Sequence, residues 1–144
     1  MRAVSVIAIL ALASLSAAAQ ESIANRAALY QTALAHIAKV KGPSSSSFIE
    51  IRVSSGPEPR KQRVNVRGQI SVAAANELVR LQLASNRSYL ADSHEWEVEV
   101  VGDAKFASVR ADNQCRDLCR YIDIGTYSFE QGKWLLLYEE RMVS

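Results

Sequence analysis

The chain has 144 residues, of which 49% are hydrophobic, 22% charged and 7% aromatic. Its 17 basic and 15 acidic side chains give a net charge of +2. This composition excludes a collagen-like, a low-complexity and a strongly charged disordered chain, and the length suits a single domain. The near-neutral charge argues against electrostatic capture of nucleic acid.

The N-terminus has the pattern of a secretory signal peptide. A positive charge precedes an apolar run over residues 3–15, and the small residues that follow suit cleavage before Gln20. The run is shorter than the ~20 residues of a membrane-spanning helix, although an N-terminal membrane anchor or a buried apolar helix is the alternative. We expect residues 1–19 to be removed on export. Residues 20–144 then form one α+β domain, secreted or periplasmic, with no transmembrane segment.

Two segments have the periodicity of amphipathic helices. The second, residues 71–84, begins at a possible N-cap, Ser71. The first, residues 21–41, ends at Gly42-Pro43. Its apolar stripe is formed by residues three or four positions apart, namely Ile23, Ala27, Tyr30, Leu34 and Ile37.

The other segments alternate apolar and polar residues with a period of two, which indicates half-buried strands. Residues 49–53 and 62–67 flank a proline-containing turn and predict a hairpin. Four more strands follow the second helix, and Gln131-Gly132 predicts the tight turn of the last hairpin. These later strands comprise residues 96–100, 105–111, 121–129 and 133–142.

The order of elements predicts an α+β fold, because an antiparallel sheet with one apolar face must cover that face. The two amphipathic helices are the available cover. We expect both helices on one face of a curved antiparallel sheet of about five to six strands. Val98, Val100, Ile122 and Ile124 would then face the helices, and the glutamates of residues 95–99 would face water.

Residues 101–104 (VGDA) and 132–138 (GKWLLLY) stand at the turns of the last two predicted hairpins. With the strands around them, residues 100–142 resemble the sheet end of nuclear transport factor two-like (SnoaL-like) domains. In that superfamily a long N-terminal helix packs over a cone-shaped sheet whose mouth often holds a ligand. The superfamily has no common catalytic motif, so the resemblance implies a fold and a pocket but no catalytic residue.

Cys115 and Cys119 form a C-x-x-x-C pair. In an exported protein, a disulfide between them is the simplest prediction, and it would stabilise a hairpin tip by roughly 2 kcal/mol. Free thiols, or a redox or metal role, are the alternatives, but the spacing is not C-x-x-C and no histidine is close in sequence. Neither His36 nor His94 predicts a metal site or a catalytic triad, so we expect no cofactor.

A candidate ligand site lies around Asp123. Tyr121, Asp123 and Tyr127 share one face of their predicted strand, and Ile122 and Ile124 share the other. If the first face lines a concavity, Asp123 is a desolvated carboxylate that can act as a general base or anchor a polar ligand. The alternative is that the isoleucines face the helices and leave Asp123 in water.

Basic residues of the first hairpin are candidates for binding a partner, namely Arg52, Arg63 and Arg67. Arg63 and Arg67 share a strand face and can bind an acidic partner. The acidic run over residues 92–103 has no basic neighbour on either side of its carboxylates. The alternative is that both runs are solvated strand faces that pair with each other across the sheet.

No catalytic set can be assembled from these residues, and whether the protein is an enzyme stays open. The leading hypothesis is an exported, non-catalytic binding protein that recognises a partner protein or an envelope component, in a role such as inhibitor or immunity protein. The second hypothesis is a cone-shaped domain that binds a small molecule or acts as an enzyme, with its pocket near Asp123.

Overall fold

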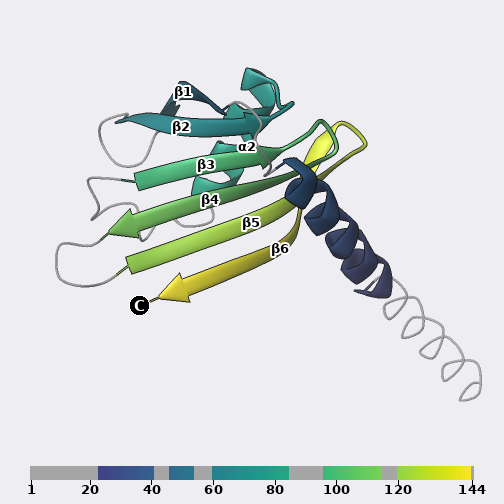
Figure 1. Ribbon diagram of the computed structural model, residues 1–144. Coiled ribbons are helices and arrows are strands. Elements are labelled where there is room, and N and C mark those ends of the chain that lie inside the picture. The colour runs from purple at the N-terminus through teal and green to yellow at the C-terminus, as the bar shows by residue number, and fades with distance from the viewer. Residues whose placement is uncertain (1–22, 41–45, 54–59, 85–95, 115–119, 144) are drawn as a thin grey trace, which may run out of the picture.

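The computed structural model describes residues 23–40, 46–53, 60–84, 96–114 and 120–143 (Figure 1). Several predictions fall outside these residues and stay predictions: the signal peptide over residues 1–19, the disulfide between Cys115 and Cys119, and the surroundings of His94.

The described residues form one six-stranded sheet, in which the strands follow one another in chain order. The strands are β1 (Ser46–Val53), β2 (Arg60–Gly68), β3 (Trp96–Gly102), β4 (Phe106–Gln114), β5 (Arg120–Glu130) and β6 (Lys133–Val143). All neighbours are antiparallel except β2 and β3, which are parallel. The expected all-antiparallel sheet is wrong at this pair. Parallel neighbours need a crossover, and the helix α2 (Val72–Ala84) supplies it.

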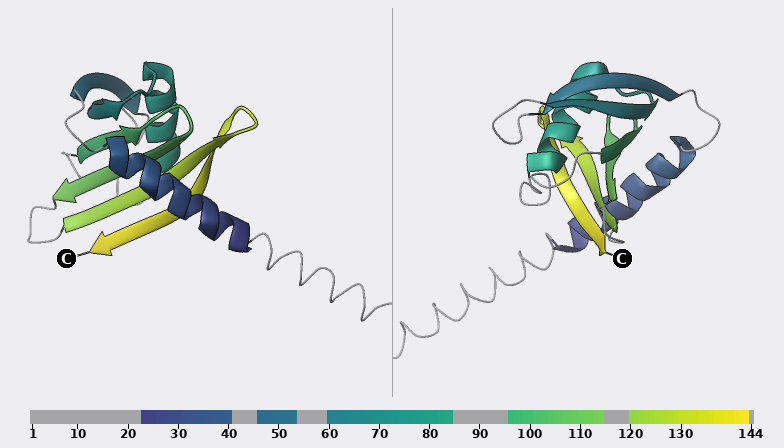
Figure 2. Two further views of the ribbon diagram at one scale, coloured as in Figure 1. Left: turned by 45° about the vertical axis from the view of Figure 1, so that its right-hand side comes forward. Right: turned by 90° about the vertical axis from the view of Figure 1, so that its left-hand side faces the viewer.

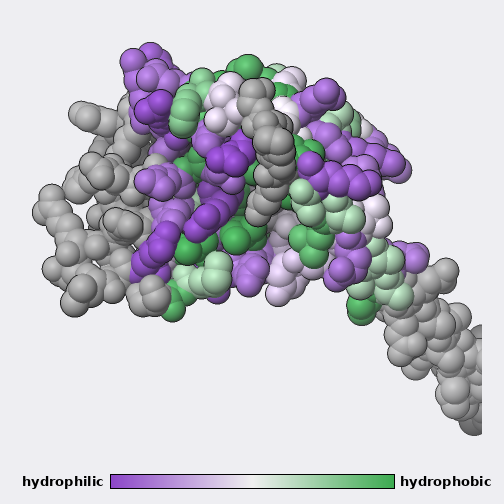
Figure 3. Space-filling view, viewed as in Figure 1, coloured by the Kyte–Doolittle hydropathy of each residue, from purple (hydrophilic) through white to green (hydrophobic). Residues whose placement is uncertain are grey.

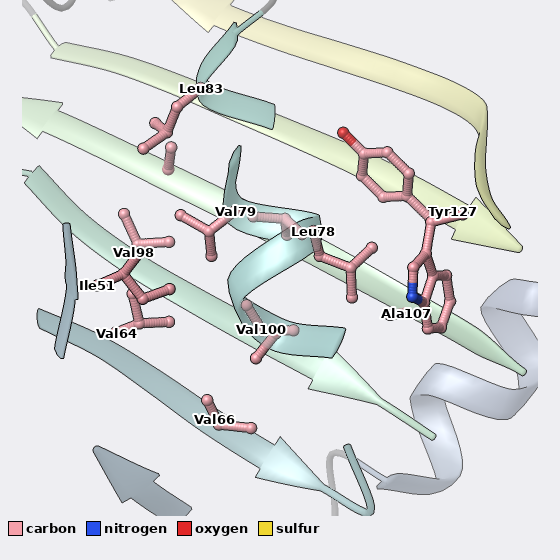
Figure 4. Close-up of a cluster of buried hydrophobic side chains, with 14 residues drawn as sticks. Ile51, Val64, Val66, Leu78, Val79, Leu83, Val98, Val100, Ala107 and Tyr127 are labelled. Atoms are coloured by element: carbon pink, nitrogen blue, oxygen red, sulfur yellow. The ribbon is translucent and has the colours of Figure 1, made fainter. Parts of the chain in front are cut away.

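Helix α2 starts at its predicted cap and covers one face of the sheet. The backbone N–H of Ala74 donates a hydrogen bond to Ser71 Oγ at 3.1 Å, which satisfies one of the free donors of the first turn. Leu78, Val79 and Leu83 of α2 belong to one buried cluster with valines and alanines of β2, β3 and β4 (Figure 4). Burial of each such side chain contributes about 1.5–3 kcal/mol, so this layer is the main core of the protein.

The helix of residues 23–40 lies on the opposite face of the sheet from α2 (Figure 2). Ala107 of β4 belongs to the core cluster under α2, whereas the ring of its neighbour Phe106 contacts His36 of helix 23–40, with centroids 4.9 Å apart. Adjacent residues of a strand point to opposite faces. The expectation that both helices pack on one face is therefore wrong.

The strand pairing explains why the face of the sheet opposite α2 also carries apolar side chains that pack against a helix. Val98 and Val100 are buried towards α2, as predicted, with 4% and 0% of their surface exposed. Ile122 and Ile124 instead lie on the other face, because they pair with Asp112 and Arg110 of β4. Strand β5 thus presents large side chains to both faces of the sheet. The alternation of residues along this strand does not reveal which of the two faces packs against α2.

Candidate functional site

The face of the sheet opposite α2 carries ionisable side chains from three neighbouring strands, and we call it the charged face. It comprises Arg63, Asn65 and Arg67 of β2, Glu97 and Glu99 of β3, and Arg110 and Asp112 of β4. The apolar residues that alternate with them turn towards α2. Cross-strand pairing places Glu99 opposite Arg110 and Glu97 opposite Asp112. Hydrophilic side chains gather on this side of the molecule next to helix 23–40 (Figure 3).

A pocket of about 330 Å³ lies in the charged face. Its lining includes Phe48 of β1 and every residue of the charged face except Arg67. This volume is at the lower end of the range for small-molecule sites. Four strands therefore build one concavity that no single segment of the sequence contains.

Asp112 is neutralised inside the charged face by two arginines. Arg120 donates from Nε to Oδ1 at 3.1 Å and from Nη2 to Oδ2 at 2.6 Å. Arg110 Nη2 lies 3.5 Å from the same Oδ2. The hydrogen bonds from Arg120 lower the pKa of Asp112, and they outweigh the opposing effect of burial. Asp112 therefore stays ionised, and its charge is balanced within the protein.

The remaining charges of the face are arranged differently. Arg67 Nε lies 3.6 Å from Glu99 Oε2, which makes a loose ion pair across β2 and β3. The guanidinium of Arg63 lies over the ring of Phe48, 3.9 Å from its centre, in a cation–π contact. Among the described residues, neither Arg63 nor Glu97 forms an ion pair.

Helix 23–40 covers the neighbouring part of this face. The Tyr30 ring lies 4.9 Å from that of Tyr138 on β6, and His36 Nδ1 donates to Asp103 Oδ2 at 3.0 Å at the β3–β4 turn. Asp103 also accepts hydrogen bonds from the backbone N–H groups of that turn.

The predicted ligand residues of β5 do share one face, but it is the face under α2. Only 2% of Asp123 and 3% of Tyr127 are exposed, and Tyr121 is half-buried. The reading that leaves Asp123 in water is wrong, because its β4 partner, Ala111, belongs to the buried core. Arg141 Nε donates a hydrogen bond to Asp123 Oδ1 at 2.8 Å. An arginine of the same chain therefore already binds this carboxylate.

Of the predicted partner-binding residues, Arg63 lines the pocket, Arg67 lies beside it on the same strand, and Arg52 is exposed on β1 outside the lining. Reasoning from sequence missed Arg110 and Asp112. Their signal was the alternation in β4, where polar residues at 108, 110 and 112 interleave with small apolar ones. Their importance depends on the strands beside β4, which that local pattern does not reveal.

Within the described ranges, no three histidine, aspartate or glutamate side chains come together as a metal site. Comparison with protein-family models, with curated proteins and with solved structures found no match to this chain. The resemblance to nuclear transport factor two-like domains thus remains a prediction. The charged face and its pocket are the features of the structure from which a function can be argued.

Proposed function

We propose that this chain is an exported, non-catalytic binding protein that recognises a partner protein or an envelope component through the charged face. The observation that carries the proposal is the pocket of about 330 Å³ between β1 and β4. It holds charges of both signs, which favours specific recognition over general attraction to polyanions. The opposite face of these strands is occupied by α2 and forms the core.

Export is supported by the sequence of residues 1–19, which has the apolar run and small residues of a cleavable signal. Among the helical residues that the structure describes, no helix has the length and apolar character to cross a bilayer. A signal peptide and a disulfide-compatible cysteine pair both suit a secreted or periplasmic location.

The test is charge reversal on β2. Arg63→Glu with Arg67→Glu replaces two cations by anions on the charged face, and we expect capture of the partner from envelope extract to fall at least about tenfold. The matched control is Arg80→Glu on the exposed side of α2. Thermal unfolding of each variant shows whether the fold is retained. Equal capture by folded double variant and wild type, at the same salt concentration, would remove β2 from the interface.

The alternative proposal is a small-ligand domain, or an enzyme, with its site at Asp123. Burial of this carboxylate beside Tyr127 supports it, but a ligand must displace or share Arg141. This proposal predicts that a small ligand raises the melting temperature, that Asp123→Asn abolishes the rise, and that Arg63→Glu leaves it intact. If Arg63→Glu abolishes the rise and Asp123→Asn leaves it intact, the ligand binds at the charged face instead.

A further inference from the structure

The wall of the pocket holds one cation and one anion, Arg63 and Glu97, that form no ion pair with any described residue. Val64 of β2 lies beside Val98 of β3, so the preceding residues, Arg63 and Glu97, are also neighbours. Their side chains form no ion pair, and the guanidinium of Arg63 instead stacks over the ring of Phe48 on β1, the strand on the other side of β2. Among the described residues, the other carboxylates of the pocket, on Glu99 and Asp112, have arginine partners.

Two further features of the pocket favour a ligand that carries hydrogen-bond donors and a positive charge. Glu97 stands directly opposite Asp112 across β3 and β4, and like charges in such a pair destabilise a sheet. Arg120 and Arg110 compensate Asp112, but neither forms an ion pair with Glu97. The side-chain oxygen of Asn65, which also lines the pocket, is buried and accepts no hydrogen bond from any residue that the structure describes. A buried acceptor without a donor is costly and is normally satisfied.

We propose that this pocket binds a zwitterionic amino-acid group, with the carboxylate on Arg63 and the ammonium on Glu97 and the Asn65 oxygen. A simple anion would meet the carboxylates of the pocket, and a simple cation would meet its two arginines. A group with both charges satisfies each side. The volume of about 330 Å³ admits one amino acid or the end of a peptide, not a folded segment. The inference rests on the proposed function and gives its ligand class.

The test uses three probes with related carbon chains: 2,6-diaminopimelate, which carries amino-acid groups, pimelate, which carries only carboxylates, and 1,5-diaminopentane, which carries only amines. Isothermal titration of the full mature chain should show saturable binding of 2,6-diaminopimelate, at least about tenfold tighter than of either control. A tripeptide that ends in the same residue distinguishes a peptide-borne group from the free amino acid. Tighter binding of the tripeptide assigns the site to peptides, and equal or weaker binding to the free amino acid.

Variants then assign the binding to the pocket. Arg63→Gln and Glu97→Gln should each weaken binding of 2,6-diaminopimelate about tenfold or more. Glu77→Gln and Arg80→Gln, which change exposed charges on α2 outside the lining, should leave it unchanged. Equal affinity for pimelate would make this an anion site, and equal affinity for the diamine a cation site; either overturns the inference. Absence of saturable binding by every probe also overturns it, while partner capture by the Arg63/Arg67 variant still decides the proposed function separately.

Discussion

Arg141 on β6 donates a hydrogen bond from Nε to Oδ1 of Asp123 on β5, at 2.8 Å. The two residues are direct cross-strand partners. Only 2% of the Asp123 side chain is exposed, against 39% of Arg141, so the partly exposed arginine compensates a charge that would otherwise be buried alone. The pair joins the last two strands of the sheet.

Removal of this arginine should be strongly destabilising. Arg141→Met leaves the Asp123 carboxylate buried without that partner, and we expect the free energy of unfolding to fall by about 3 kcal/mol. Urea denaturation measures the change, and Arg80→Met on α2 is the matched control. Adding Asp123→Asn to Arg141→Met should restore part of the loss, since the amide carries no charge. No recovery in the double variant would mean that the pair does not act through this charge.

Tyr127 should make the protein sensitive to alkali. Burial, with a smaller effect of Glu139, raises the pKa of Tyr127 above its usual value near 10. Above about pH 10 the unfolded chain therefore loses this proton while the folded chain keeps it, and stability falls as the pH rises. Tyr127→Phe should make this fall shallower, by up to about 1.4 kcal/mol per pH unit. Urea unfolding between about pH 9 and pH 11 tests the slope.

The same variant has an effect at neutral pH. The hydroxyl of Tyr127 donates to Gln82 Oε1 at 2.6 Å, close to Gly125, whose lack of a Cβ leaves room for the Gln82 side chain. Loss of that buried hydrogen bond should cost about 1 kcal/mol at pH 7. An unchanged slope in alkali together with this loss at pH 7 would contradict the predicted titration but not the hydrogen bond.

The β5–β6 turn is strained at one residue and relaxed at the next. Gln131 and Gly132 both have positive φ, 52° and 76°, as a two-residue hairpin turn of this kind requires. Gly132→Ala should lower stability by about 1 kcal/mol through the backbone alone, because an added Cβ meets no atom within 4 Å. Gln131→Asn should raise the melting temperature, since asparagine tolerates this conformation better. Equal melting temperatures of Gly132→Ala and wild type would exclude the backbone explanation.

The contact between Asp103 and His36 should make the packing of helix 23–40 on the sheet weaker in acid. Burial by itself raises the pKa of Asp103, but hydrogen bonds from His36 and from the backbone N–H groups of Phe106 and Lys105 outweigh it and lower the pKa. The stabilisation is therefore present above about pH 4 and is lost as the pH falls through the lowered value. Asp103→Asn keeps an acceptor for the turn and should cost about 1 kcal/mol at pH 7. The difference from wild type should shrink in acid unfolding as the pH falls below the usual aspartate pKa of about 4.

Local periodicity was sufficient to predict most elements of the sheet. The six strands, α2 with its Ser71 cap and the turn at Gln131 all lie where their sequence patterns indicate. The stripe of the first helix was less accurate. Ile37 is 5% exposed, as expected, but Leu34 is 38% and Ile23 68% exposed. Several residues of that helix can face inward, and only the surface it packs on decides which do.

The candidate site was predicted in part and for a clear reason. Arg63 and Arg67 share a face because they are four residues apart on one strand, a relation that is local. Glu97, Arg110 and Asp112 join Arg63 only because β3 runs parallel to β2 and β4 lies on its far side. Which charges neutralise one another, and which remain available to a ligand, depends on these long-range pairings.

The amino-acid sequence alone therefore determined the elements, their turns and the alternation of side chains within each strand, because these depend on neighbours along the chain. Tertiary structure decided that the helices lie on opposite faces, that Asp123 is buried with Arg141, and that Arg63 and Glu97 line one pocket. Those outcomes depend on strand order and register, which bring together residues distant in sequence, and their energies arise only when the sheet has formed.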